Sequence, residues 1–299
     1  MLRLTKLKYH LECGEYLQAR QEAERLIQLG DLVGEELVQA YRGAALAHYH
    51  LRNLFAAIKL AEKALAGARQ LGNWPLIGKA RYDLGEYHLV LGDNLVAQEY
   101  LRQFLADLNL YPELTTLRAW AHHKLGLLHR LQRDFSSALA SHQLAVQLHQ
   151  QHEDRAGVIE ATRGVVWCYL TLGEPEKAWP HLHRLTTQLA PEGDARTRAS
   201  LLTDLAYYYQ QAGDLASSMD YCAEVMAPGR PGVDEHILAT ACVIAGENAL
   251  ILDREKEARI FANLAQEYAL QAGQPALVDR AVALRRRLCE VNTRPLQVS

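Results

Sequence analysis

The sequence lacks the long apolar run that a membrane-spanning helix requires. Although 49% of its residues are hydrophobic, which excludes a disordered chain, charged residues interrupt the apolar positions every few residues. No stretch approaches the roughly 20 apolar residues of a bilayer span. The first residues, Met1–Lys6, are not followed by the apolar core of a signal peptide. We therefore expect a cytoplasmic protein that does not enter a membrane.

An excess of basic residues is also missing. The 32 Lys and Arg residues are outnumbered by 35 Asp and Glu residues, which gives a formal net charge of −3. Surfaces that bind nucleic acid favour a basic stripe. Direct binding of nucleic acid is therefore not expected.

Paired cysteines are absent. The five cysteines are odd in number, far apart and never in a C-x-x-C pair: Cys13, Cys168, Cys222, Cys242 and Cys289. Neither a zinc knuckle nor a disulfide framework is indicated. We expect these cysteines to be small buried hydrophobic residues.

Catalytic motifs are missing as well. The sequence contains no G-x-S-x-G, no phosphate-binding glycine loop and no H-E-x-x-H. Four of its 13 histidines recur in one slot of a repeat described below: His10, His48, His88 and His129. Successive slots would lie about 10 Å apart, whereas zinc ligands sit about 2 Å from one ion. We therefore expect half-buried rings that each seek a hydrogen bond, with no metal, no cofactor and no enzymatic activity.

What the sequence does contain is an internal repeat. One small residue recurs at steps of 38, 40, 41, 40, 40 and 40 residues, as Ala19, Ala57, Ala97, Ala138, Ala178, Ser218 and Ala258. Around each, apolar residues at three- and four-residue spacing fill two stretches of about 14, which predicts two amphipathic helices. A break such as Gly92-Asp93 separates the two stretches. Its glycine suits a left-handed helix end and its acid suits the next helix N-terminus.

The repeat predicts how the chain is organised. An array over 1–274 divides into units near 1–29, 30–70, 74–109, 112–152, 155–190, 194–227 and 233–272. Within a unit, a Gly or Ala such as Gly85 faces the small residue 12 positions later, so that two helices approach closely. A stripe of Leu277, Ala281, Leu284, Leu288 and Val291 predicts a capping helix over 275–292, with Arg285–Arg287 on its solvated side. We expect 293–299 to be a flexible tail.

This frame resembles the tetratricopeptide repeat family, which has small residues where the helices cross, a large aromatic slot three residues on, and a later alanine. The period of about 40 is similar to the long repeats of kinesin-light-chain-like scaffolds and bacterial peptide-sensing regulators. The resemblance implies an all-α fold: a right-handed superhelical solenoid of about seven helical hairpins plus a C-terminal capping helix.

The resemblance also implies a binding groove on the concave wall, which the first helix of each unit lines. Trp, Tyr and Arg in such positions are typical of interface hot spots. An alternative is that Trp120 and Trp167 pack between neighbouring hairpins. The positions that the family pattern selects are Arg42, Tyr49, Lys79, Tyr82, Glu86, Trp120, His123, Arg130, Arg163, Trp167, Tyr207, Gln210 and Glu247.

The leading interpretation is a non-enzymatic scaffold whose groove binds another protein or a peptide. One alternative is a ligand-sensing domain of a bacterial peptide-responsive regulator without its own effector module, because the first repeat begins near residue 3. Another is a self-associating structural subunit, such as a homodimer. The lysine and asparagine clamp for chaperone tails is not matched, because its slots hold residues such as Gly43 and Asp83.

Overall fold

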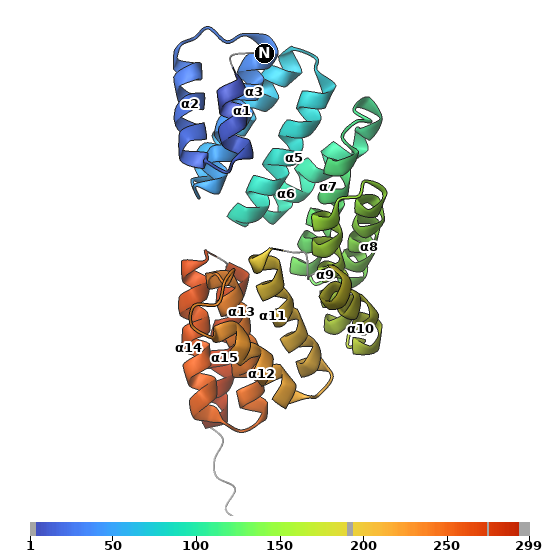
Figure 1. The fold of residues 1–299 in the computed structure, drawn as a ribbon, viewed down its shortest axis with the longest axis vertical. Helices are drawn as coiled ribbons and strands as arrows, with labels where there is room; N and C mark the ends of the chain where they lie inside the picture. Colours follow the sequence, from blue (N-terminus) through green and yellow to red (C-terminus); the bar gives the residue numbers. More distant parts are fainter. Residues whose placement is uncertain (1–3, 190–193, 274, 293–299) are drawn as a thin grey trace, which may run out of the picture. The chain divides into compact units, whose positions relative to one another are not determined.

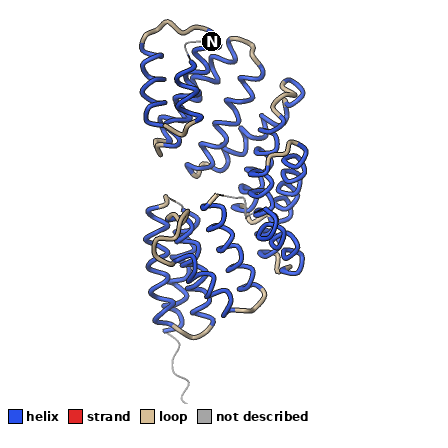
Figure 2. Tube along the Cα trace, viewed as in Figure 1, coloured by secondary structure: helices blue, strands red, loops and turns tan. Residues whose placement is uncertain are grey.

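The computed structural model describes residues 4–189, 194–273 and 275–292, and within these ranges it is built from helices without strands (Figure 2). Figure 1 shows the helices, numbered in chain order, with labels on all but α4. Their bounds are α1 Thr5–Glu12, α2 Tyr16–Gln28, α3 Gly34–His50, α4 Leu54–Gln70, α5 Trp74–Leu91, α6 Asn94–Ala106, α7 Thr115–Leu131, α8 Phe135–Gln151, α9 Arg155–Thr171, α10 Pro175–Arg184, α11 Ala195–Gln211, α12 Leu215–Met226, α13 Glu235–Ile251, α14 Glu255–Gln271 and α15 Pro275–Asn292. The predicted tail, 293–299, lies outside the described residues.

The chain divides into two compact units. The N-terminal unit comprises residues 1–128 and 147–153, and the C-terminal unit comprises 129–146 and 154–299, so α7 and α8 contribute residues to both. In the N-terminal unit α1 contacts α3 and α3 contacts α5. In the C-terminal unit α9, α11, α13 and α15 contact one another in succession. We call α1, α3, α5, α7, α9, α11 and α13 the first helices of the pairs.

Each first helix ends in the same kind of turn. Seven residues in these turns have φ between 57° and 94°: Gly14, Arg52, Gly92, Arg133, Gly173, Gly213 and Asp253. The amide of the next residue donates to the carbonyl five residues earlier, as Asp93 does to His88 at 2.9 Å. This left-handed helix end satisfies carbonyls that the helix leaves unpaired. Four of the seven are glycines, whereas Arg52, Arg133 and Asp253 adopt a conformation that disfavours a side chain.

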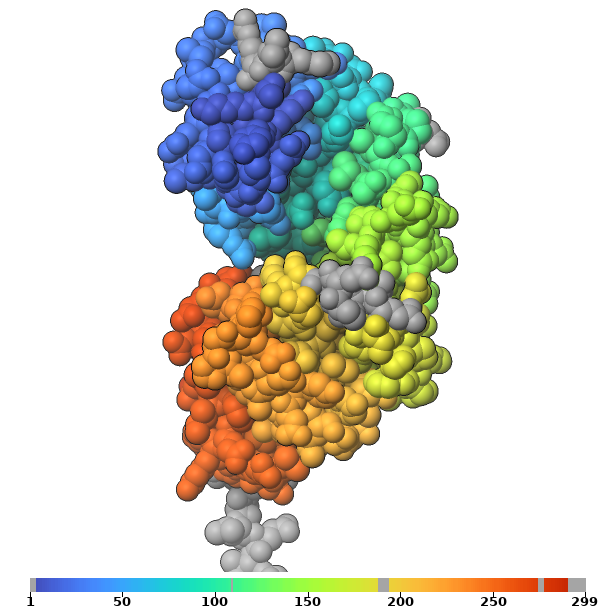
Figure 3. All heavy atoms as spheres, in the orientation of Figure 1, coloured from blue at the N-terminus to red at the C-terminus, as the bar shows by residue number. Residues whose placement is uncertain are grey.

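The small residues of the repeat lie where the two helices of a pair cross. All seven, from Ala19 to Ala258, are fully buried. At Gly85 an added Cβ would lie 2.7 Å from Cγ of Leu101 and 3.4 Å from the carbonyl oxygen of Ala97, 12 residues later. The space-filling view shows side chains closing the spaces between neighbouring ribbons on the face that it displays (Figure 3). The crossings are therefore packed without room for a larger residue.

Helix α15 packs against α13 and α14 of the C-terminal unit through the predicted stripe. Leu277, Ala281, Leu284 and Leu288 are buried in clusters with residues of α13 and α14. Arg285–Arg287 are exposed.

The expectation of buried cysteines is wrong for two of the five. Cys168, Cys222 and Cys242 are buried, but Cys13 and Cys289 are exposed. Cys13 follows the last residue of the short helix α1, and Cys289 follows the buried Leu288, on the solvent side of α15. Cys13 thus lies in the turn between α1 and α2, and Cys289 lies one helical turn after the exposed Arg285 and Arg286 of α15.

The four histidines of the repeat slot each have a polar neighbour. His10 pairs with Glu15 at 2.5 Å, His48 with Glu24 at 3.3 Å, and His88 with Asp93 at 3.2 Å. Nδ1 of His129 lies 3.4 Å from Oγ of Ser141. All four rings are buried or half-buried. Each makes its polar contact inside one of the two compact units, as the position in the repeat predicts.

Candidate partner-binding faces

The N-terminal unit gathers charged and aromatic residues on α3, α5 and the N-terminal part of α7. Arg42 of α3 donates from Nε and Nη2 to the carboxylate of Asp83 on α5, at 2.7 and 3.1 Å. Burial opposes the charge of Arg42, but the carboxylate of Asp83 outweighs it and raises the pKa of Arg42. Lys124 of α7 pairs with Glu86 of α5 at 2.8 Å. The charges of this face are thus neutralised between neighbouring first helices.

Aromatic rings accompany these ion pairs. The rings of Tyr49 and Tyr87 stack with centroids 4.8 Å apart. Trp120 meets the edges of His123 and His149 with centroids 5.8 and 4.8 Å apart. Trp120 is half-buried and packs against the core of the N-terminal unit.

The C-terminal unit has a corresponding face that centres on a buried carboxylate. Asp204 of α11 is completely buried and accepts from Nε of Arg163 at 2.6 Å and from Nε1 of Trp167 at 2.6 Å. Arg163, on α9, also donates to Glu160 at 3.3 Å. Burial opposes the charge of Arg163, but Asp204 and Glu160 outweigh it and raise the pKa of Arg163. Arg163 and Trp167 therefore hold α9 to α11.

A row of three flat side chains crosses the same face. Cζ of Arg130, near the end of α7, lies 5.4 Å from the ring centroid of Trp167 on α9. The indole of Trp167 stacks on the ring of Tyr207 of α11, with centroids 4.2 Å apart and planes 20° from parallel. All three side chains are half-buried. Burial lowers the pKa of Arg130.

Gln210 and Glu247 belong to a polar network between the helices of the C-terminal unit. Nε2 of Gln210 donates to Oδ1 of Asn248 at 2.8 Å, and Asn248 donates to Oγ of Ser218 at 2.7 Å. Glu247 pairs with Arg280 of α15 at 3.3 Å. This network ties α11, α12, α13 and α15 together, which is a structural role for two residues that the sequence assigns to a groove.

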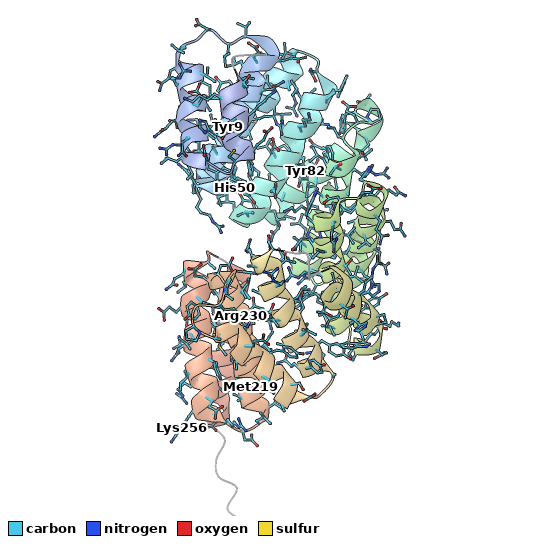
Figure 4. The ribbon with its side chains drawn as sticks, in the orientation of Figure 1. Tyr9, His50, Tyr82, Met219, Arg230 and Lys256 are labelled. Carbon is cyan, nitrogen blue, oxygen red and sulfur yellow. The ribbon has the colours of Figure 1, made fainter. Side chains whose placement is uncertain are left out.

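Three of the predicted binding residues offer little surface to a partner. Tyr82, labelled in Figure 4, is 7% exposed and packs edge-on against Phe104. His123 is 6% exposed and Gln210 is 9% exposed. The other predicted residues are half-buried: Arg42, Tyr49, Lys79, Glu86, Trp120, Arg130, Arg163, Trp167, Tyr207 and Glu247.

The repeat pattern does not single out the two acidic residues that organise these faces, Asp83 and Asp204. Each lies 41 residues after its arginine, which is one repeat period. A search for opposite charges one period apart on successive first helices finds both pairs. The same search reveals that Arg42 and Arg163 are already paired within the chain.

A shallow cavity of about 480 Å³ lies elsewhere, at the start of the N-terminal unit. Charged side chains of its lining pair with one another: Glu22 contacts Arg25 at 2.6 Å and Lys6 at 3.6 Å. Across the described ranges, no three His, Cys, Asp or Glu side chains gather as ligands for a metal ion. The described helices also include none that combines the length and apolarity of a membrane span.

Comparisons with known proteins show the fold. No family model matches the sequence, and no curated protein matches it. A tetratricopeptide repeat protein from Parabacteroides merdae superposes with a TM-score of 0.64 at 14% identity, over 94% of this chain and 97% of that one. A Rap protein complexed with competence and sporulation factor superposes with a TM-score of 0.72 at 12% identity, over 94% and 79%.

A shorter match supports the same conclusion. The kinesin light chain TPR-like repeats of Podosopora anserina superpose with a TM-score of 0.54 at 15% identity, over 66% of this chain and 96% of that one. The predicted all-α array of tetratricopeptide-like hairpins is therefore confirmed as the fold of this chain. The right-handed sense of a superhelix stays a prediction.

Proposed function

We propose that the chain is a non-enzymatic scaffold whose first helices bind a segment of another protein or a peptide. The observation that carries this proposal is the row of Arg130, Trp167 and Tyr207 on the C-terminal unit. Arg, Trp and Tyr are the residue types that dominate interface hot spots, because they combine a large contact area with a polar group. The tetratricopeptide-like fold supports the same function, because stacked repeats present extended surfaces to partners.

We assign binding to fewer residues than the family pattern selects. Arg163 is occupied by the buried Asp204, and Gln210 and Glu247 belong to the network that joins α11 to α15. Their first role is to hold neighbouring helices together. On the C-terminal unit we therefore assign contact with the partner to Arg130, Trp167 and Tyr207. On the N-terminal unit we assign it to half-buried residues such as Tyr49 and Trp120.

A selection of binders from a random-peptide display library tests this proposal. A photoreactive amino acid in place of Tyr207 should crosslink to the selected peptides, whereas the same substitution for Ile260 on α14, which is 58% exposed, should not. Tyr207→Ser should weaken binding, and circular dichroism should show that the variant is still folded at the temperature of the binding assay, although the loss of ring packing lowers its thermal stability. The proposal would be contradicted by selected peptides that crosslink only to the photoreactive residue at position 260. A library that yields no binder would also contradict it.

A second candidate function is a ligand-sensing regulator that acts on a separate effector. The likeness to a Rap protein complexed with competence and sporulation factor, over 94% of this chain, favours it. In that case a peptide and a protein partner should affect each other's affinity by equal factors, because coupling between two sites is reciprocal. Titration of each ligand at saturation of the other measures this coupling, and independent affinities would leave only the scaffold.

Self-association and the cellular location are also proposals. Light scattering across a concentration series would detect a homodimer. The formal charge of −3 supports partners other than nucleic acid. We propose that the protein works in the cytoplasm, where fractionation of the host cell would find it.

A further inference from the structure

Arg130 differs from three other half-buried arginines, each of which is paired with a carboxylate of a neighbouring helix. Arg42 is paired with Asp83, Arg163 with Asp204 and Glu160, and Arg280 with Glu247. Arg130 lies over the ring of Trp167, and no carboxylate in the described part of the chain lies within ion-pair distance of it. Its guanidinium is half-buried without the acidic partner that each of the other three possesses.

This arrangement leaves the donors of Arg130 unused. A guanidinium carries five N–H groups in a planar fork that matches a carboxylate. Contact with the face of an indole stabilises the cation, but it does not use the N–H groups at the edge of the guanidinium. Burial lowers the pKa of Arg130, so its charge is poorly solvated in the free protein. A negative group supplied by a partner would compensate that charge.

We propose that Arg130 binds a carboxylate of the partner segment, and that Trp167 and Tyr207 hold an apolar side chain next to that carboxylate. This inference rests on the proposed function and specifies the chemistry of the ligand. The geometry supports it because the stacked rings of Trp167 and Tyr207, 4.2 Å apart, continue directly from the guanidinium. A partner segment in which a carboxylate lies next to an apolar residue would contact both the guanidinium of Arg130 and the rings of Trp167 and Tyr207.

The charges around Arg130 favour a monoanion. Arg130 and Arg163 supply two positive charges, and Glu160 and Asp204 supply two negative ones, so the cluster is formally neutral. A carboxylate adds one negative charge, and it can pair bidentately with Arg130, the cation of this set that forms no ion pair. A phosphate monoester carries nearly two negative charges at neutral pH and would be repelled by Asp204 and Glu160. A carboxylate therefore fits the charge of this cluster better than a phosphate monoester does.

The carboxylate could come from an Asp or Glu side chain or from the C-terminus of a peptide. A synthetic random-peptide library, prepared once with free C-termini and once amidated, separates these sources. Selected peptides are resynthesised with each acid replaced by its amide, and their affinities are measured by fluorescence anisotropy. The proteins compared are wild type, Arg130→Gln, Arg130→Lys and, as a matched control, Arg259→Gln, which removes an exposed arginine from α14.

We expect neutralisation of one carboxylate to weaken binding to wild type about tenfold or more, as a charge-assisted contact of 1.5–3 kcal/mol does. The same neutralisation should have little effect on Arg130→Gln, and an intermediate effect on Arg130→Lys, which keeps the charge and loses the planar fork. Arg259→Gln should behave as wild type. Dependence on the free C-terminus assigns the carboxylate to the chain end, and dependence on Asp or Glu assigns it to a side chain.

Two results would overturn the inference while leaving the proposed function intact. One is a set of peptides that crosslink through position 207 and bind equally well without any carboxylate. The other is a loss on neutralisation that is as large in Arg130→Gln as in wild type, because the carboxylate would then contact another residue. A library that yields no binder to wild type would overturn the proposed function itself.

Discussion

Arg163 and Asp204 lie 41 residues apart and join the neighbouring helices α9 and α11 through a contact of 2.6 Å. Arg42 and Asp83, also 41 residues apart, join α3 and α5 at 2.7 Å. In each unit the repeat period therefore places a carboxylate opposite an arginine of the preceding first helix. Two of the four cations that the sequence suggests for a partner, Arg42 and Arg163, are therefore already neutralised within the chain.

Replacing Arg163 by methionine should strongly destabilise the C-terminal unit. Asp204 is completely buried, and removal of its main cationic partner leaves a charge away from water. Breaking a buried pair in this way costs about 3–5 kcal/mol. Urea denaturation followed by circular dichroism measures the change in the free energy of unfolding.

The double variant Arg163→Met/Asp204→Leu is the matched control for that prediction. Because it removes both charges, it should recover much of the lost stability. Trp167 then loses one acceptor at 2.6 Å, so recovery should stop short of wild type. A double variant as unstable as the single one would show that the ion pair does not account for the loss.

Replacing Arg130 by methionine should have the opposite outcome. Burial disfavours the charge of Arg130 and lowers its pKa, while methionine keeps an apolar stem of similar length against Trp167. We expect the free energy of unfolding to stay within about 0.5 kcal/mol of wild type or to rise, as for substitutions that break no buried interaction. The measurement is the same urea titration. A loss of several kcal/mol would identify Arg130 as a structural residue and count against its role in binding.

Replacing Arg133 by glycine should stabilise the protein. Arg133 has φ of 62° in the turn between α7 and α8, a conformation in which glycine has no steric penalty. The gain should be about 0.5–1 kcal/mol, because the greater freedom of glycine in the unfolded chain offsets part of the relieved strain. The mirror substitution Gly92→Ala, at φ of 94°, should be destabilising. Thermal unfolding of both variants checks the sign.

Mild acid should weaken the C-terminal unit through His142. This side chain is completely buried, and burial lowers its pKa from 6.5 to about 3. The stability that the neutral ring contributes is fully present above pH 6.5. Below that pH the unfolded chain takes up a proton that folded His142 does not, so stability falls towards pH 3. The slope should approach about 1.4 kcal/mol per pH unit.

The variant His142→Gln, which does not titrate, isolates this effect. Burial also lowers the pKa of His50, His122, His181 and His236, which contribute to the slope of both proteins. The contribution of His142 is therefore the difference between wild type and variant, which is sharpest between pH 6.5 and about 5.5, above the ordinary pKa of carboxyl groups. The free energy of unfolding of the variant should fall less steeply over this interval. Equal slopes in the two proteins would show that His142 does not carry the pH dependence.

The fold could be predicted from the sequence because its signals are local and repeated. The small residues from Ala19 to Ala258 are fully buried, as a helix crossing requires. Gly85 lies against Ala97 and Leu101, as its position 12 residues before Ala97 predicts. Left-handed turns were expected at glycines, and the repeat imposes the same turn on Arg52, Arg133 and Asp253. There the array overrides the local preference of the residue.

The residues proposed for binding are harder to predict. The surface that each offers to a partner depends on its contacts with side chains of other repeats. A family pattern places Arg42 and Arg163 on the first helices, but it does not reveal that Asp83 and Asp204 neutralise them. Nor does it reveal that Tyr82 packs on Phe104, or that Gln210 donates to Asn248. Burial of these side chains is set by the exact spacing of adjacent helices, which the repeat frame does not specify.

The internal neutralisation of charge has a consequence for how a partner arrives. A surface whose cations and carboxylates cancel projects little electrostatic field into solution, so diffusional encounter is not steered. Association should then proceed at about 10⁵–10⁶ M⁻¹s⁻¹, the range for neutral surfaces, and change little with ionic strength. Discrimination among partners would lie in how slowly the correct one dissociates from Arg130, Trp167 and Tyr207.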